Sequence, residues 1–172
     1  MKRLFFGLSL GEADKTALAQ WREQALPAIR KPVPVANFHL TLAFVGGLSP
    51  AAMAGALALA AALPFAPFDL VLDSFGQWPR SGIAFLAPSQ PPEALMALAA
   101  ELQAISNNVG GFADHRRYQP HLTLARGAHR PMEPLLPPPA LHLRAEHFAL
   151  FESAAGRYQE IASLPQAQKK EG

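Results

Sequence analysis

Short apolar runs and runs with helical spacing alternate along the first half of the chain. Residues 3–10 and 38–45 are short, apolar and end at glycine, which is typical of buried β-strands. Between them, residues 13–26 carry apolar side chains at helical spacing and predict an amphipathic helix. Ser49 and Pro50 form a typical helix start, and the alanine-rich run after them predicts a helix to residue 63.

The second half contains one more helical pattern and several strand patterns. A helix is predicted over residues 93–105, and a glycine pair follows it. Strands are predicted over residues 68–72, 82–87, 121–125, 141–151 and 158–163, with an exposed loop containing Trp78 between the first two. Residues 166–172 are expected to form a mobile tail.

The order of these elements is strand, helix, strand, helix, two strands, helix, three strands. This order predicts an α+β fold with antiparallel or mixed sheets and with helices packed on their outer faces. A chain of 172 residues has the usual size of one domain and can bury a substantial core. We therefore expect a single domain over residues 1–172.

Composition excludes several classes of protein. Hydrophobic residues make up 50% of the chain and charged residues 16%, which excludes an intrinsically disordered protein. The net charge of +2 excludes a polybasic nucleic-acid coat protein but permits an anionic ligand. The chain has no cysteine, so any catalytic group must be of another kind. No apolar run reaches the roughly 20 residues of a membrane span, and we expect a cytoplasmic protein without a membrane partner.

The pentapeptide His-Leu-Thr-Leu-Ala occurs twice, at residues 39–43 and 121–125. Core packing explains the leucines, but it does not explain why both polar positions are the same in the two copies. On a strand, the leucines share one face while His and Thr share the other. If the chain forms two similar lobes, His39, Thr41, His121 and Thr123 can therefore face one cleft between them.

Two imidazoles and two hydroxyls at one point suit a phosphodiester. Imidazole has an unperturbed pKa of about 6.5, so one histidine can accept a proton while the other donates one. The threonine hydroxyls can donate hydrogen bonds to the non-bridging oxygens as negative charge develops on them.

Two simpler interpretations of the repeat compete with this one. A single His-x-Thr sequence is more typical of a structural strand start, but its duplication favours chemistry. A zinc site is disfavoured because neither copy has a third His or an acidic ligand at a familiar spacing, and cysteine is absent. We expect neither a metal nor a cofactor.

These residues resemble the 2H phosphoesterase superfamily, whose hallmark is a pair of His-x-Thr/Ser-x motifs. Within it, the sequence is most similar to the bacterial RNA 2′,3′-cyclic phosphodiesterase branch, also called 2′-5′ RNA ligase-like. The similarity extends over most of the chain and includes residues 3–6, 37–46, 120–126 and 150–153.

The resemblance implies a two-lobed α+β fold with a pseudo-twofold axis and a central cleft. It implies hydrolysis of a terminal RNA 2′,3′-cyclic phosphate to a 2′-phosphomonoester, and in reverse the ATP-independent formation of a 2′-5′ bond. His39 would be the proton donor, His121 the proton acceptor, and Thr41 and Thr123 would hold the phosphate. This order of donor and acceptor comes from the family alone, because the two motifs are interchangeable in the sequence.

The resemblance also suggests that Arg126 contacts the phosphate and that Phe44 stacks on a base. Strict alternation would place both side chains on the leucine face of their strands. They can reach the cleft only if the strand ends or twists at that point.

Two other functions remain open. The chain could be a non-catalytic RNA-binding or nucleotide-binding module, or a phosphodiesterase for small cyclic nucleotides. The expected partners are RNA ends or nucleotides that carry a 2′,3′-cyclic phosphate. No obligate protein partner is expected, and the protein is predicted to be a monomer.

Overall fold

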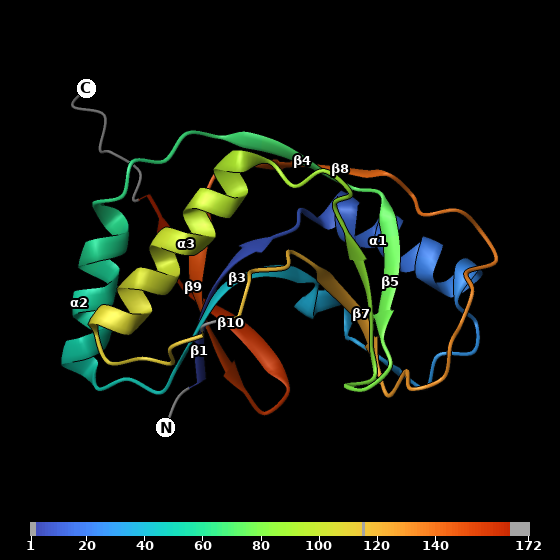
Figure 1. Cartoon of the computed structure of the whole chain (residues 1–172), viewed down its shortest axis with the longest axis horizontal. Helices are drawn as coiled ribbons and strands as arrows, with labels where there is room; N and C mark the ends of the chain where they lie inside the picture. Colours follow the sequence, from blue (N-terminus) through green and yellow to red (C-terminus); the bar gives the residue numbers. More distant parts are fainter. Residues whose placement is uncertain (1–2, 115, 166–172) are drawn as a thin grey trace.

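The computed structural model describes residues 3–114 and 116–165 and contains three helices and three sheets in these ranges (Figure 1). The predicted tail at residues 166–172 lies outside them. The first sheet has the strand order β10-β9-β1-β3, with bounds Arg157–Leu164, Phe148–Ala154, Arg3–Ser9 and His39–Gly46. All of its pairings are antiparallel.

The second sheet has the order β2-β7-β6-β5, with bounds Lys31–Pro32, Leu122–Arg126, Ile83–Ala87 and Ser74–Trp78. A third, two-stranded sheet pairs β4 (Phe68–Leu72) with β8 (Leu141–Ala145). The two copies of the pentapeptide therefore lie in different sheets, one in β3 and the other at the start of β7. The α+β prediction with antiparallel sheets is confirmed.

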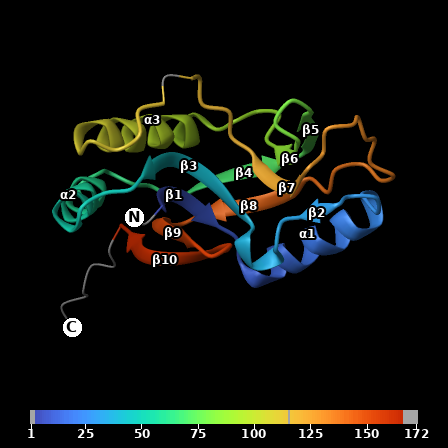
Figure 2. The same cartoon turned by 90° about the horizontal axis from the view of Figure 1, so that it is seen from below.

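Helices α2 (Pro50–Ala61) and α3 (Glu93–Asn108) lie at one end of the molecule, and α1 (Glu12–Ala25) lies at the other (Figures 1 and 2). A short 3-10 turn, Val35–Asn37, leads into β3. The Ser49 hydroxyl accepts a hydrogen bond from the amide of Ala52 at 3.1 Å, so Ser49 caps α2 as the sequence predicts.

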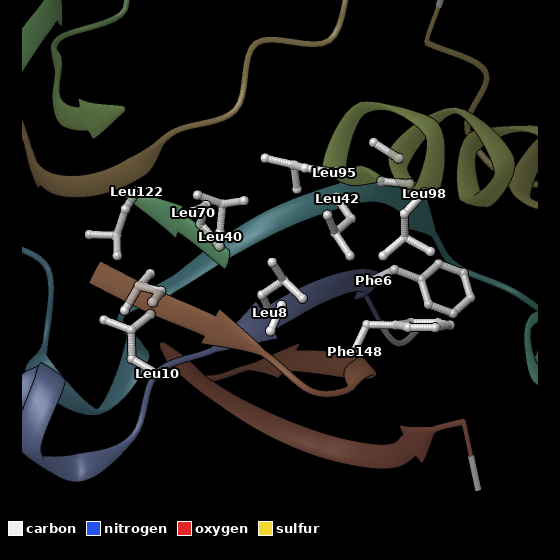
Figure 3. Close-up of a cluster of buried hydrophobic side chains, with 14 of the residues drawn as sticks. Phe6, Leu8, Leu10, Leu40, Leu42, Leu70, Leu95, Leu98, Leu122 and Phe148 are labelled. Atoms are coloured by element: carbon white, nitrogen blue, oxygen red, sulfur yellow. The ribbon is translucent and has the colours of Figure 1, made fainter. Parts of the chain in front are cut away.

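The leucines of the repeated pentapeptide form part of the central core. Leu40, Leu122 and Leu124 are completely buried, and Leu42 is 2% exposed. They belong to one cluster with side chains from β1, β4, α3 and β9, and Figure 3 shows Leu40 and Leu122 within it. Burial of each such side chain contributes about 1.5–3 kcal/mol to the stability of the fold. Because the leucines must therefore face the core, the opposite face of each strand is free for other side chains.

Two predicted segments were wrong. The loop predicted after residue 72 contains the strand β5, which pairs with β6; Gly76 and the polar residues Ser74 and Gln77 mask the strand pattern in the sequence. The strand predicted over residues 141–151 is two strands, β8 and β9, which belong to different sheets. The short strand β2 is absent from the predicted elements, because it contains Pro32 and a proline lowers the expectation of a strand.

Gly76 and Gly55 make a matched pair for testing the packing. A Cβ on Gly76 would lie 2.5 Å from Cζ of Phe85 on the paired strand, whereas a Cβ on Gly55 in α2 would meet nothing within 4 Å. We expect Gly76→Ala to lower the free energy of unfolding by about 1–3 kcal/mol and Gly55→Ala to raise it by about 0.5–1 kcal/mol. Urea denaturation measures both; equal effects of the two substitutions would contradict the close approach at Gly76.

Candidate active site

The two histidines and two threonines of the repeat line one cavity of about 1450 Å³. His39 and Thr41 come from β3, His121 directly precedes β7, and Thr123 lies within it. All four side chains are partly exposed, while the leucines between them are buried. The structure therefore brings the four predicted residues together from two sheets.

A β-bulge follows each His-x-Thr pair. In the first sheet, Phe6 pairs with Ala43 and the next residue, Gly7, pairs with Thr41, so Leu42 is an extra residue in β3. In the second sheet, Ala84 pairs with Ala125 and Phe85 pairs with Thr123, so Leu124 is the extra residue in β7. The two bulges occupy the same position in the two pentapeptides.

Each bulge moves the following side chains to the opposite face of its strand. Ala43 and Ala125 are buried, and Phe44 and Arg126 then point out of the core. Both line the cavity that contains the four predicted residues, and Phe44 is 46% exposed. Strict alternation is therefore broken within each strand, and neither strand has to end before its cleft-facing residue.

A side chain from another part of the chain contacts the backbone at each bulge. Nη1 of Arg22 in α1 donates to the carbonyl oxygens of Leu124 at 2.8 Å and Val33 at 2.7 Å. The hydroxyl of Tyr118 donates to the carbonyl oxygen of Thr41 at 2.7 Å, directly before the other bulge. These bonds satisfy carbonyl groups in the two strands that carry the site.

Arg22 is a largely buried cation whose burial lowers its pKa. Its guanidinium carbon lies 4.8 Å from the centre of the Phe38 ring, and Phe38 directly precedes His39. Arg22 therefore contacts the backbone of the second motif and the residue before the first. It links the two motifs although it does not line the cavity.

His39 has both ring nitrogens in hydrogen bonds. Nδ1 lies 2.8 Å from the carbonyl oxygen of Asn37, which can only accept, so Nδ1 carries the proton. In the neutral ring Nε2 is then an acceptor, and the Thr41 hydroxyl donates to it at 2.7 Å. Aromatic rings of Phe5 and Tyr158 enclose the imidazole, with centroids 4.8 and 4.9 Å away.

The side chain of Asn37 fixes part of this enclosure. Its Nδ2 donates to the carbonyl oxygen of Gly156 at 2.9 Å, and its Oδ1 accepts from the amide of Tyr158 at 3.3 Å. The hairpin between β9 and β10 is thereby tied to the turn that precedes β3, and the Tyr158 ring stays against His39.

His121 has the same anchoring on the other side. Its Nδ1 donates to the carbonyl oxygen of Gln119 at 2.8 Å, again two residues earlier, so the neutral ring has an acceptor at Nε2. The rings of Trp78 and Phe85 lie edge-on to it, with centroids 4.7 and 5.7 Å away. Trp78 is therefore part of the site, whereas the sequence placed it in an exposed loop.

Both histidines favour the neutral form. Burial lowers the pKa of His39 to about 4; the bond to Asn37 opposes this shift, and the charges of His121 and Arg126 add to it. Burial also lowers the pKa of His121, with Arg126 acting in the same direction and the bond to Gln119 opposing it. At neutral pH the free protein therefore presents two unprotonated Nε2 atoms.

Other features bear on the class of site. In residues 3–114 and 116–165, no three His, Cys, Asp or Glu side chains gather closely enough to hold a metal ion. Across the same ranges, every helix falls short of the length and apolar character that a membrane crossing requires.

The low pKa of His39 predicts an acid-dependent loss of stability. The unfolded chain binds a proton at His39 near pH 6.5 and the folded chain only near pH 4, so acid favours unfolding within this interval. The free energy of unfolding should fall by on the order of 3 kcal/mol more in the wild type than in His39→Asn between pH 7 and 4. Urea denaturation at a series of pH values measures this difference; parallel curves for the two proteins would contradict it.

A family model and a curated relative point to the same family of proteins. Residues 11–157 match the 2′-5′ RNA ligase superfamily. The RNA 2′,3′-cyclic phosphodiesterase of Escherichia coli (strain K12) is 34% identical over 159 residues, which cover 91% of this chain and 89% of that protein.

Solved structures agree with this relationship. E. coli LigT complexed with NADP+ has a TM-score of 0.87 and 33% identity, and covers 94% of this chain and 95% of its own. E. coli LigT complexed with 3′-AMP has a TM-score of 0.87 and 32% identity, with 97% and 99% covered. A protein of Thermus thermophilus has a TM-score of 0.76 and 29% identity, with 94% and 96% covered. The chain therefore belongs to the 2′-5′ RNA ligase superfamily, and the resemblance to 2H phosphoesterases is confirmed.

Proposed function

We propose that this protein is an RNA 2′,3′-cyclic phosphodiesterase that produces a 2′-phosphomonoester. The observation that carries the proposal is a cavity lined by two histidines, each with Nδ1 fixed on a carbonyl oxygen and Nε2 available for proton transfer. The E. coli relative that carries this activity in its name supports the choice of reaction.

In the proposed reaction, the oxygen of a water molecule attacks phosphorus as His121 Nε2 takes one of its protons. The bond between phosphorus and the ribose 3′ oxygen breaks, and protonated His39 gives its Nε2 proton to that oxygen. The products are a 2′-phosphomonoester and a 3′-hydroxyl group. His121 ends the cycle protonated and His39 neutral, and exchange with solvent restores the starting state.

Thr41 couples protonation of His39 to phosphate binding in this scheme. Its hydroxyl donates to Nε2 when the imidazole is neutral. Once Nε2 carries a proton, the hydroxyl proton is free to bond a non-bridging phosphate oxygen. Thr123 and Arg126 line the same cavity and complete the set of donors for the developing charge, while Phe44 offers a ring for stacking.

The low pKa of His39 requires that the bound substrate help to charge it. An anionic phosphate next to the ring favours the imidazolium, and it offsets the burial and the Arg126 charge that oppose protonation. The reverse reaction, formation of a 2′-5′ bond, uses the same groups with an RNA 5′-hydroxyl in place of the attacking water. Hydrolysis dominates unless two RNA ends are held together.

We also propose a single domain with two similar lobes that acts as a monomer. The equivalent bulges in β3 and β7 support the similarity of the lobes. The contribution of all the candidate residues by one chain supports a complete site in a single copy. A cytoplasmic location stays a prediction of the sequence.

The proposed reaction is tested by identifying the product that the protein forms from an RNA oligonucleotide with a terminal 2′,3′-cyclic phosphate. We expect a 2′-phosphate, with turnover undiminished in excess chelator. His39→Ala and His121→Ala should each lower kcat by at least about 100-fold, because each removes one proton-transfer group. His142→Ala is the matched control, since the His142 side chain in β8 is 66% exposed, lies beside Asp69 and does not line the cavity.

Each part of this test has a distinct contrary result. A 3′-phosphate product would exchange the roles of His39 and His121. Strict metal dependence would overturn the two-histidine mechanism. Tight binding of the cyclic-ended RNA without any product would instead favour a non-catalytic binding module.

The pH dependence of kcat/KM tests the protonation scheme. One histidine must be charged and the other neutral, so the profile is bell-shaped, and its two limbs report the pKa values of the free enzyme. Because burial lowers both values, we expect the maximum to lie below pH 6.5. A flat profile from pH 6 to 9 would contradict the scheme.

A further inference from the structure

The cavity extends well beyond the two histidines. At about 1450 Å³ it exceeds the roughly 300–1,000 Å³ that is usual for a small-molecule site. Its lining continues from the β3 motif to Met96 and Gln103 of α3 and to Phe112 in the loop after α3. A cavity of this size has room for a ligand longer than one terminal nucleotide.

Phe112 and Phe44 are unusual among the aromatic residues. In residues 3–114 and 116–165, they are the aromatic side chains that remain strongly exposed, at 52% and 46%. Both line this cavity. Exposed rings in a cavity that also contains phosphate-binding groups are typical platforms for stacking nucleobases.

The backbone of Phe112 is held firmly in place. Its amide donates to the carbonyl oxygen of Val45 at 2.8 Å, and its carbonyl oxygen accepts from Gln103 Nε2 at 2.9 Å and Ser106 Oγ at 3.0 Å. A Cβ on the preceding Gly111 would lie 2.6 Å from Ser106 Oγ and 2.9 Å from the oxygen of Val45. The loop therefore approaches β3 and α3 closely, and the exposed ring of Phe112 extends from a backbone that hydrogen bonds hold in place.

The two exposed rings lie on neighbouring stretches of backbone. Val45, which bonds to Phe112, directly follows Phe44 in β3. Strand β3 is at the edge of its sheet, so the loop with Phe112 covers an otherwise open edge beside the cleft. Phe44 and Phe112 therefore line one cavity from two stretches of backbone that a hydrogen bond joins.

Charge along the same loop fits a linking phosphate. Arg116 and Arg117 line the cavity and are exposed. Arg116 is held by Asp114, with its Nε and Nη2 at 3.0 and 2.9 Å from the carboxylate oxygens. Arg117 adds a second exposed cation to the same lining, and the phosphodiester that links two successive nucleotides is an anion that a guanidinium can pair with.

We propose that Phe112 forms a second base-binding site, which takes the nucleotide on the 5′ side of the terminal cyclic phosphate. The preferred substrate is then an RNA end of at least two nucleotides, and free mononucleotides are poor substrates. This inference rests on the proposed function for the position of the terminal phosphate.

The test compares a dinucleotide with a mononucleotide, each ending in a 2′,3′-cyclic phosphate. We expect the wild type to favour the dinucleotide in kcat/KM, and Phe112→Ala to lower this preference about tenfold or more, as loss of one stacked base does. Phe112→Trp should keep the preference because it keeps a ring. Leu135→Ala, 70% exposed on another loop, is the matched control.

A binding measurement separates this inference from the proposed reaction. The ligands for calorimetry are the dinucleotide and the mononucleotide that end in a linear 3′-phosphate, so that no turnover occurs. The dissociation constant of the mononucleotide divided by that of the dinucleotide gives the preference in binding. Phe112→Ala should lower this preference by the same factor. The inference is overturned if the wild type shows no preference in either ratio. It is also overturned if Phe112→Ala weakens the dinucleotide and mononucleotide equally, since this indicates a purely structural role.

Discussion

The extra residue in each motif strand is the constraint on which the site depends. The leucines of the pentapeptide must stay in the core, so a regular strand would bury every second side chain after them. The bulges at Leu42 and Leu124 interrupt this alternation at the same point in both copies. As a result, the core keeps its leucines while Phe44 and Arg126 join the histidines and threonines at the cavity. Arg22 donates a hydrogen bond to the carbonyl oxygen of Leu124, and Tyr118 donates one to that of Thr41, so a side chain from elsewhere in the chain holds the backbone at each bulge.

The same arrangement sets the electrostatics. Each imidazole is anchored through Nδ1 to the carbonyl two residues earlier and is enclosed by aromatic rings, so both rings favour the neutral tautomer with an acceptor at Nε2. The two sides differ in the cleft-facing residue after the bulge: Phe44 on one side offers an apolar surface and Arg126 on the other offers a charge. The two equivalent bulges thus carry different cleft-facing side chains, and the site is asymmetric. This asymmetry suits a substrate with a base at one end and a phosphate at the other.

Much of this site could be predicted from the sequence because its chemistry is local. The repeat shows His39, Thr41, His121 and Thr123 directly, and alternation within a strand predicts that they share a face. The bulges could not be predicted, since an extra residue leaves no trace in the sequence of a strand. Trp78 was missed because β5 lacks a clear alternating pattern, and it takes its place only through pairing with β6. Arg22 and Tyr118 act on residues far away in the chain, and no sequence pattern connects them to the motifs.

The central claim is that two neutral histidines present unprotonated Nε2 atoms to one cavity, and that a bound phosphate favours protonation of the imidazoles, which lets His39 act as the proton donor. Nuclear magnetic resonance of the imidazole nitrogens, recorded against pH in the free protein and with inorganic phosphate, tests this directly. The account predicts the Nδ1–H tautomer for His39 and His121, titration of both below pH 6.5 in the free protein with His39 the lower, and a rise in both pKa values when phosphate binds. Titration of His39 at or above pH 6.5 in the free protein, or an Nε2–H tautomer, would contradict it.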